Sequence, residues 1–447
     1  MTIPEQPAQT TAMGVIPVAP PADQATGHRA PSPKPASGMH YGWWVVISAV
    51  FSTFVCLGIG RFALAMLLPA MGAALALDYA QMGWISTANF VGYLLGALWV
   101  RRLLPRHGER RLIAMSLMLI IATMLGVSAV SSFVPVLLLY GATGLGSGIA
   151  FICTVSLVPH WFASQWRGRA VGFLSAGMGL GIILSGWAVP LANREMGELG
   201  WRMSWGGLAL VCLPFVLFCV IKVRNRPEGL GLVPIGALPG VIIDADAPAQ
   251  TGAGTGNSLR NVILRLGAIY FLFGATYVVY GTFIVTTLVR EHGMTETQAG
   301  GFWMWLGLFS VFCGPLLGAF SDRRGRRAGI SLALFLQASA YVLISYGTGK
   351  AVVYISITLF GLSAFAVPLI MSAAVADYAT PLRAAAIIGT ITAIFGIGQM
   401  LGPILAGIMA DYSGSFTPAY LAAASLAALA IAITLTLPDP PSHRDPA

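Results

Sequence analysis

Long apolar stretches alternate with short polar stretches along most of the chain. Twelve predominantly apolar segments are each long enough for the roughly 20 residues that one membrane-spanning helix needs. The predicted helices are residues 41–68, 81–103, 112–130, 133–158, 169–191, 203–222, 262–289, 298–320, 328–346, 351–376, 385–409 and 417–437. The pattern therefore predicts an all-α membrane protein with twelve transmembrane helices.

The composition excludes a soluble protein. Apolar residues make up 57% of the chain and charged residues only 9%, whereas a soluble chain carries about 25% charged residues. The net charge of +9 could suggest nucleic acid, but the basic residues stand in short clusters between apolar segments. We therefore expect a lipid bilayer and no nucleic acid as partner. The five cysteines show no spacing typical of a metal, haem or disulfide site, so no cofactor is expected.

Polar segments divide the chain into five parts. Residues 1–40 are rich in Pro, Ala, Gln and Thr and are predicted to form a disordered tail, with a second short tail at 438–447. Residues 223–261 contain several Pro and Gly and are predicted to form a flexible linker. The linker separates an N-terminal six-helix bundle at 41–222 from a C-terminal six-helix bundle at 262–437. Most Lys and Arg fall on one side if the N-terminus is inside, which predicts two cytoplasmic termini.

The two predicted bundles repeat each other at a nearly constant offset. Gly60-Arg61-Phe62 in the first half matches Gly281-Thr282-Phe283 in the second. Three spaced glycines also match, as the pairs Gly177 with Gly398, Gly181 with Gly402 and Gly186 with Gly407. Parallel repeats of six helices place a substrate site near the midplane of the bilayer, between two pseudo-symmetric bundles.

Arg61 is the leading candidate for a functional residue. It is the basic residue that lies well inside an apolar segment, where no Asp or Glu is found. An arginine near the bilayer centre costs roughly 2.5–3.5 kcal/mol on insertion scales, and ionisable residues there are functional by default. Its planar fork suits a carboxylate. The alternative is that Arg61 only extends its charge to the membrane surface along its aliphatic stem.

A charged motif joins the eighth and ninth predicted helices, in the order Gly318-Ala-Phe-Ser-Asp322-Arg323-Arg324-Gly325-Arg326-Arg327. It resembles the loop signature of the major facilitator superfamily, and the resemblance covers residues 41–437. It implies that a set of residues in this loop and its first-half copy controls the cytoplasmic gate. These residues are Gly96, Gly318, Asp322, Arg323, Gly325, Arg326 and Arg327.

Each part of this motif has a physical role. Gly318 would let a neighbouring helix approach, Asp322 would accept hydrogen bonds from arginines or a helix N-terminus, and Gly325 would permit a tight turn. The alternative is that the arginines only set the topology. In the first half Gly96 is kept, but Val100 stands where the acid should be. Any contact by which this acid holds the cytoplasmic gate shut would therefore be made by the second half alone.

Two further motifs resemble different subgroups. Gly58-Ile59-Gly60-Arg61-Phe62, with Leu67-Leu68-Pro69 at the helix end, resembles a group of poorly characterised bacterial permeases, which implies the cell inner membrane. Residues 140–148, followed by Trp161-Phe162 and residues 167–172, are more distantly similar to monocarboxylate and oxalate–formate carriers. Those carriers hold the carboxylate with a basic residue in the eighth or eleventh helix, and this chain has none there.

The family resemblance implies that helices 1, 4, 7 and 10 line the substrate site, with helices 2, 5, 8 and 11 beside them. The polar residues near mid-depth of these helices are the predicted substrate-binding residues: Arg61, Asn89, Thr143, Tyr277, Tyr280, Thr282 and Gln399. Tyr277 and Tyr280 are three residues apart and are expected on one helix face.

We therefore expect a monomeric secondary transporter, a permease that moves a small organic solute by alternating access. The best candidate for the solute is an organic anion held through its carboxylate. One alternative is an efflux permease for multiple drugs or other hydrophobic compounds, in which Arg61 is purely structural. The other is a membrane sensor that has lost transport.

The sequence does not favour an enzyme or an ATP-driven pump. It contains no phosphate-binding Gly-x4-Gly-Lys-Ser/Thr loop and no acid/base pair within a helix. None of the 16 Asp and Glu residues is predicted at mid-helix, so we predict that no protein carboxylate couples protons to transport. Asp78, Asp377 and Asp411 are the possible exceptions, because they stand near helix ends.

Overall fold

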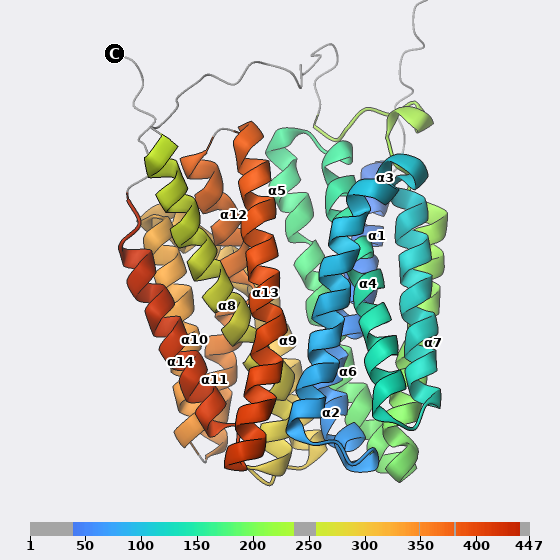
Figure 1. Ribbon diagram of the computed structural model, residues 1–447. Coiled ribbons are helices and arrows are strands. Elements are labelled where there is room, and N and C mark those ends of the chain that lie inside the picture. The colour runs from blue at the N-terminus through green and yellow to red at the C-terminus, as the bar shows by residue number, and fades with distance from the viewer. Residues whose placement is uncertain (1–38, 237–255, 348, 380, 439–447) are drawn as a thin grey trace, which may run out of the picture. The chain divides into compact units, whose positions relative to one another are not determined.

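The computed structural model describes residues 39–236, 256–347, 349–379 and 381–438 (Figure 1). Within these residues every regular element is a helix, and strand-like pairing is limited to a single bridge. The elements are α1 (Tyr41–Thr53), η1 (Phe54–Phe62), α2 (Ala63–Ala74), α3 (Tyr79–Ala129), α4 (Phe133–Leu157), η2 (Val158–Trp161), α5 (Ser164–Gly172), α6 (Leu174–Met196), η3 (Gly197–Leu199), α7 (Gly200–Lys222), η4 (Glu228–Leu230), α8 (Gly256–Arg290), α9 (Glu296–Arg324), α10 (Arg326–Tyr346), α11 (Lys350–Ser363), α12 (Ala366–Tyr378), α13 (Pro381–Ser413) and α14 (Thr417–Leu435).

Ten helical stretches in the described part of the chain are long and apolar enough to cross a membrane. Two of them are too long for one crossing, because Tyr79–Ala129 has 51 residues and Trp166–Lys222 has 57, against about 20 for a single span. A break at Gly108 divides the first, and η3 separates α6 from α7 in the second. Counted as two crossings each, they bring the total to twelve. The predicted all-α membrane fold is confirmed.

Glycines with positive φ make the turn after the second transmembrane helix of each half. Gly108 has φ +70° inside α3, and Gly325 has φ +91° between α9 and α10. Residues with a side chain disfavour this region of backbone conformation, whereas glycine adopts it freely. The tight turn predicted at Gly325 is therefore present, and the first half makes the same kind of turn. We call this end of the helix bundle the turn end.

The two halves meet closely at the opposite end, where α3 and α9 begin. There α3 packs against α13, α6 against α9 and α2 against α8. A Cβ atom on Gly83 would lie 2.4 Å from the carbonyl oxygen of Pro403, and one on Gly300 would lie 2.3 Å from that of Gly186. Small residues that allow such backbone contact are typical of helix interfaces in membranes.

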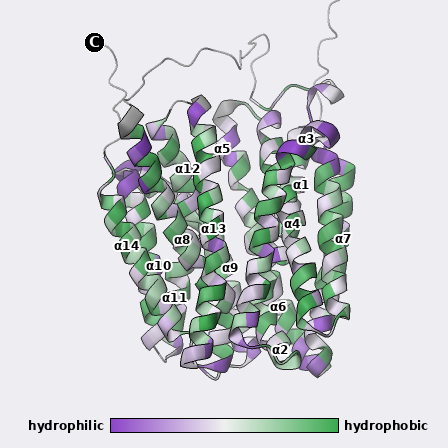
Figure 2. Ribbon diagram, in the orientation of Figure 1, coloured by the Kyte–Doolittle hydropathy of each residue, from purple (hydrophilic) through white to green (hydrophobic). Residues whose placement is uncertain are grey.

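Apolar residues cover the middle of the helices, and polar residues gather near the helix ends (Figure 2). Many large apolar side chains are exposed, including Leu138, Trp187 and Leu217. In water such a surface would favour aggregation, but in a bilayer it contacts lipid tails. The exposed apolar surface therefore agrees with an integral, multi-pass membrane protein.

Part of the predicted linker packs on the first half. The Ile235 N–H donates to the Trp161 carbonyl at 2.9 Å, and the Ala163 N–H donates to the Ile235 carbonyl at 2.9 Å. The Trp161 indole donates to the Arg224 carbonyl at 3.1 Å. Residues 237–255 of the predicted linker lie outside the described residues. The α8 helix begins at Gly256, six residues before the predicted start at 262, so the last part of the predicted linker is helical. Nearly all of the two predicted tails also lies outside them.

Candidate functional site

The segment that contains Arg61 is a π-helix, η1, between α1 and α2. A π-helical turn is rare and occurs frequently at functional sites. The two glycines before Arg61 allow close packing there. A Cβ atom on Gly58 would lie 2.9 Å from the Gly181 Cα in α6, and one on Gly60 would lie 3.3 Å from the Ser147 Oγ in α4. The glycines thus let α4 and α6 pack directly against the helix that carries Arg61.

Two aromatic rings hold the Arg61 guanidinium inside the bundle. Its Cζ atom lies 4.7 Å from the ring centroid of Phe90 and 4.1 Å from that of Tyr93, both on α3. Cation–π contacts of this kind stabilise a desolvated cation. The hydroxyl of Tyr140 donates to the Arg61 carbonyl at 2.8 Å and fixes the backbone. The guanidinium therefore stays inside the protein and does not extend to the membrane surface.

The Arg61 side chain has hydrogen-bonding capacity left over. Its Nε and Nη2 atoms are buried and have no hydrogen-bond partner among the described residues. Leaving a buried donor of a charged group unsatisfied costs more than the roughly 1–3 kcal/mol of a neutral group. An arginine offers a planar pair of donors, and a carboxylate matches that pair geometrically. The site is therefore set up to bind an anion.

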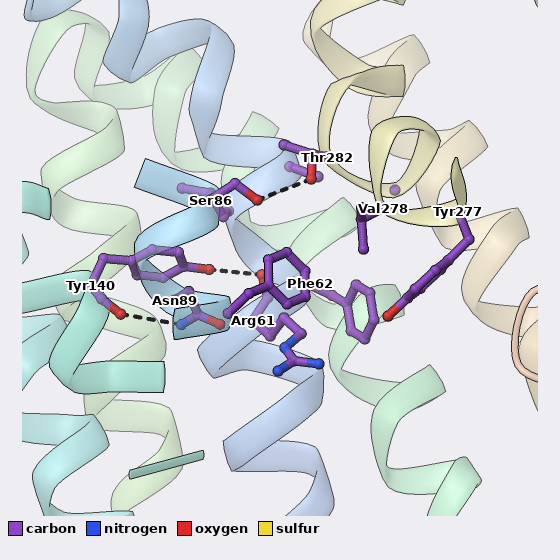
Figure 3. A pocket seen from close by; sticks show the side chains of 12 residues that line it. Arg61, Phe62, Ser86, Asn89, Tyr140, Tyr277, Val278 and Thr282 are labelled. Carbon is purple, nitrogen blue, oxygen red and sulfur yellow. Dashed lines mark hydrogen bonds between the residues drawn. The ribbon is translucent and has the colours of Figure 1, made fainter. Parts of the chain in front are cut away.

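A cavity of about 20 Å³ lies beside Arg61, between the two halves (Figure 3). A volume of this size holds roughly one water molecule, so the site is contracted in this conformation. Side chains of both halves form its wall, and Arg61 is the one charged group among them. The lining residues are Arg61, Phe62, Leu64, Ala65, Ser86, Asn89, Phe90, Tyr140, Tyr277, Val278, Gly281 and Thr282.

Four of the seven predicted substrate-binding residues line this cavity: Arg61, Asn89, Tyr277 and Thr282. The Asn89 amide donates to the Tyr140 carbonyl at 3.2 Å, while its Oδ1 is buried without a partner among the described residues. The Thr282 hydroxyl lies 3.1 Å from that of Ser86 and so bridges the halves. Figure 3 shows both pairs of residues at the cavity.

The other three predicted residues do not line the cavity. Gln399 stands behind it and donates to the Tyr277 hydroxyl. Thr143 faces another helix of its own half, where its hydroxyl lies 2.8 Å from that of Thr123. Tyr280 bonds to Ser356 at 2.8 Å and stacks on Phe360. Tyr277 and Tyr280 are three residues apart on α8, but their hydroxyls bond to different neighbouring helices, and only Tyr277 lines the cavity.

The sequence analysis missed the α3 residues that surround Arg61. Ser86, Phe90 and Tyr93 follow one another at spacings of four and three, which places them on one helix face together with Asn89. This spacing was a usable signal. The rings of Phe90 and Tyr93 contact the cation through their faces, a role that the polarity of a side chain does not indicate.

The predicted gate residues lie at the turn end. Arg326 donates to Asp322 and, from its Nε, to Asp377 Oδ2 at 2.7 Å, so α10 is tied to the ends of α9 and α12. A Cβ atom on Gly96 would lie 2.3 Å from the Leu145 carbonyl oxygen, which is a contact inside the first half. No atom of the described residues lies within 4 Å of a Cβ position on Gly318, so the helix approach expected there is not seen in this part of the chain. Arg323 is exposed.

Two helical halves around a small cavity with one buried positive charge are the arrangement expected of a membrane transporter. The chain belongs to a family of the major facilitator superfamily, because the family profile described as "Uncharacterised MFS-type transporter YbfB" matches residues 53–435. The predicted family is therefore confirmed, and the protein is a transporter rather than an enzyme.

Relatives across the superfamily agree with this assignment. The chain is 26% identical to the 3-(3-hydroxy-phenyl)propionate transporter of Escherichia coli (strain K12), over 75% of this chain and 79% of that protein. It is 22% identical to the hexuronate transporter of Bacillus subtilis (strain 168), over 86% and 92%. The fold is similar to the crystal structure of a bacterial homologue of the human lysosomal transporter Spinster in an inward-facing, unoccupied conformation. That match has a TM-score of 0.71 at 15% identity and covers 89% of this chain and 97% of the other.

Proposed function

We propose that the protein is a secondary transporter of a small organic anion and that Arg61 binds the carboxylate of this substrate. The observation that carries the proposal is the buried guanidinium, which faces the cavity between the halves with two nitrogens unpartnered in the described structure. A carboxylate would satisfy these donors in a bidentate, charge-assisted contact. The names of the two relatives support the proposal, since both describe carboxylic acids.

The charge of the cavity favours a substrate with a single negative charge. Arg61 is the one charged side chain in the lining, so one carboxylate neutralises the site and a second would be left buried and unpaired. The rest of the wall suits an apolar or hydroxylated body. Phe62 and Phe90 offer ring surface, and the hydroxyl of Tyr277 and the Oδ1 of Asn89 offer a donor and an acceptor.

Binding also requires the halves to move, because a cavity of about 20 Å³ cannot hold an organic acid. We propose that the substrate enters by alternating access. In this conformation the end where α3 begins is held shut. Both carboxylate oxygens of Asp411 accept hydrogen bonds at 2.8 Å, one from the Tyr79 N–H and one from the Ala80 N–H. The Asn193 amide also donates to Glu296 at 2.5 Å.

The close backbone contacts between the halves gather at the end where α3 and α9 begin. A Cβ atom on Gly83, Gly300 or Gly407 would lie within 2.4 Å of a carbonyl oxygen of the other half. We therefore propose that the described conformation exposes the turn end and closes the other. Closure at the turn end would bring a neighbouring helix to Gly318 and would require Asp411 to release α3.

Proton coupling through a protein carboxylate is not part of this proposal. The three acids near helix ends all have partners in this conformation. Asp78 caps the start of α3 by accepting from the Gln81 N–H at 2.6 Å, Asp377 pairs with Arg326, and Asp411 bonds to α3. We expect accumulation driven by a pH gradient to survive neutralisation of each acid singly. Loss of that accumulation in one variant, with counterflow intact, would identify the proton site.

The decisive experiment is a binding screen followed by transport. Purified protein would be tested by thermal shift with 3-(3-hydroxyphenyl)propionate, galacturonate, a primary amine and a hydrophobic drug, and the best ligand would be used for counterflow in proteoliposomes. We expect a carboxylate to stabilise the wild type and the Arg324→Gln control, but not Arg61→Gln. Drug transport that survives Arg61→Gln would support the efflux alternative. Absence of flux for every ligand that binds would support the sensor alternative.

A further inference from the structure

A second cavity, separate from the substrate site, lies at the turn end of the first half. It has a volume of about 500 Å³ and is formed where the break in α3 meets the end of α7. Its lining includes the two arginines Arg110 and Arg111. The lining residues are His107, Arg110, Arg111, Ala114, Val220 and Asn225. No acidic side chain belongs to this set, so the cavity is suited to a negatively charged ligand.

The framework of this cavity is fixed by hydrogen bonds. The side chain of Arg110 donates twice to the Val220 carbonyl, at 3.3 Å from Nε and at 3.0 Å from Nη2. The Arg110 N–H donates to Asn225 Oδ1 at 2.9 Å, directly after the turn at Gly108. These contacts tie α3 to the end of α7 and leave Arg111 free. Among the described residues Arg111 forms no ion pair and is exposed.

The surface next to the cavity is apolar and follows both helices towards the membrane. Met115 (61% exposed) and Met118 continue the α3 face of Arg111, at the spacings of four and seven that one helix face requires. On α7, the exposed residues Ile221 (51% exposed) and Leu217 are four positions apart, so they also lie on one helix face. A basic cavity next to an exposed apolar surface matches a molecule with an anionic head and an acyl chain. A free anion would use only the basic part.

We propose that this cavity binds the head group of an anionic phospholipid whose acyl chain lies along α3 and α7. Basic pockets between transmembrane helices bind the phosphate groups of such lipids, and each basic residue near the membrane surface strengthens the attraction to an anionic lipid. A lipid bound here would belong to the leaflet at the turn end, which the distribution of Lys and Arg predicts to be the cytoplasmic leaflet. Arg111 donates to the phosphate, and the fixed Arg110 adds to the local positive potential.

The test uses the purified full-length protein in neutral detergent. Thermal stabilisation would be titrated with phosphatidylglycerol, with phosphatidylcholine and with inorganic phosphate. Two variants probe the site. Arg111→Gln removes one charge, and Ala114→Phe fills the cavity while keeping every charge. The matched control is Arg324→Gln, which removes one exposed charge from the turn end of the second half.

We expect phosphatidylglycerol to stabilise the wild type and the control, with phosphatidylcholine and inorganic phosphate without effect. Arg111→Gln should weaken the apparent affinity about fivefold, which corresponds to about 1 kcal/mol, and Ala114→Phe should weaken it as well. Equal stabilisation by phosphatidylcholine would overturn the proposal. So would saturation by inorganic phosphate at the same concentration, or an Arg324→Gln effect as large as that of Arg111→Gln. An unchanged affinity in Ala114→Phe would show that the lipid binds elsewhere.

Discussion

The two halves of this transporter offer a comparison within one chain, because they repeat the same helices with different charges. At the cavity, the first half supplies Arg61 and the second half supplies Thr282 at the matching position. The backbone plan is shared, but only one half carries the charge. A carboxylate bound at Arg61 would therefore meet neutral hydroxyls on the opposite wall, which suits a substrate that is anionic at one end only.

The turns of the two halves also share a backbone conformation and differ in their charged side chains. Gly108 and Gly325 both have positive φ, so the backbone reverses by the same means. In the second half Arg326 follows the glycine and pairs with Asp322 and Asp377. In the first half the buried Glu109 follows the glycine, and Arg110 bonds to backbone and amide groups instead of an acid. The two turns thus share their backbone conformation, but their side chains form different contacts.

The largest effect should come from the charge at the cavity. Removing one partner of a buried, hydrogen-bonded charge pair costs about 2–5 kcal/mol, so Arg61→Gln should weaken carboxylate binding by at least about 30-fold. Arg61→Lys keeps the charge and loses the fork, and it should bind with intermediate affinity. Binding would be measured by calorimetry with the ligand from the screen. An affinity equal to the wild type in Arg61→Gln would refute the role of this residue.

The two turn glycines should differ in their response to a side chain. Gly108 and Gly325 combine positive φ with ψ near 160°, a region that is essentially restricted to glycine. A side chain there costs about 1–3 kcal/mol, so Gly325→Ala and Gly108→Ala should both lower the melting temperature. The Gly108 variant should lose more, because its Cβ would lie 2.7 Å from Asn225 Nδ2, whereas nothing lies within 4 Å at Gly325. Equal losses in thermal unfolding would show that the Asn225 contact does not hold the first turn.

The closed end shows a third asymmetry, because the second half contributes the charged Asp411 and the first half the neutral Asn193. A carboxylate at an exposed helix N-terminus contributes up to about 1 kcal/mol, so Asp411→Asn should shift the conformational equilibrium by up to about fivefold. Ala65 lines the cavity, so labelling of an Ala65→Cys variant by maleimide added at the end where α3 begins should increase. Asp78→Asn is the control, since Asp78 caps α3 without joining the halves. Equal labelling of the Asp411→Asn and Asp78→Asn variants would argue that Asp411 does not hold this end closed.

The smallest effect should come from the neutral wall. Thr282→Val removes the hydroxyl that lies 3.1 Å from that of Ser86 and keeps the shape. A neutral hydrogen bond contributes about 0.5–1.5 kcal/mol, so carboxylate affinity should change only a few-fold. Calorimetry under the conditions used for Arg61→Gln would check this. A loss as large as that of Arg61→Gln would mean that the second half contributes equally to binding.

The sequence by itself determined the helices, the family and the identity of the central charge. Apolar length indicates which segments cross a bilayer, because a helix needs about 20 predominantly apolar residues to span the hydrocarbon core. The same rule makes Arg61 visible, since a charge in such a segment is costly and rare. The turn at Gly325 was also predictable, because a glycine requirement is local to the backbone.

Only the tertiary structure decided which side chains surround that charge. Thr143 and Tyr280 bond to neighbouring helices and leave the cavity, while the rings of Phe90 and Tyr93 cover the guanidinium. The hydrogen bonds from the start of α3 to Asp411 join residues more than 300 positions apart, so no local pattern reveals them. Such contacts depend on how helices rotate and approach one another. Hydrophobic periodicity leaves that choice open in a membrane, where lipid and protein interior are equally apolar.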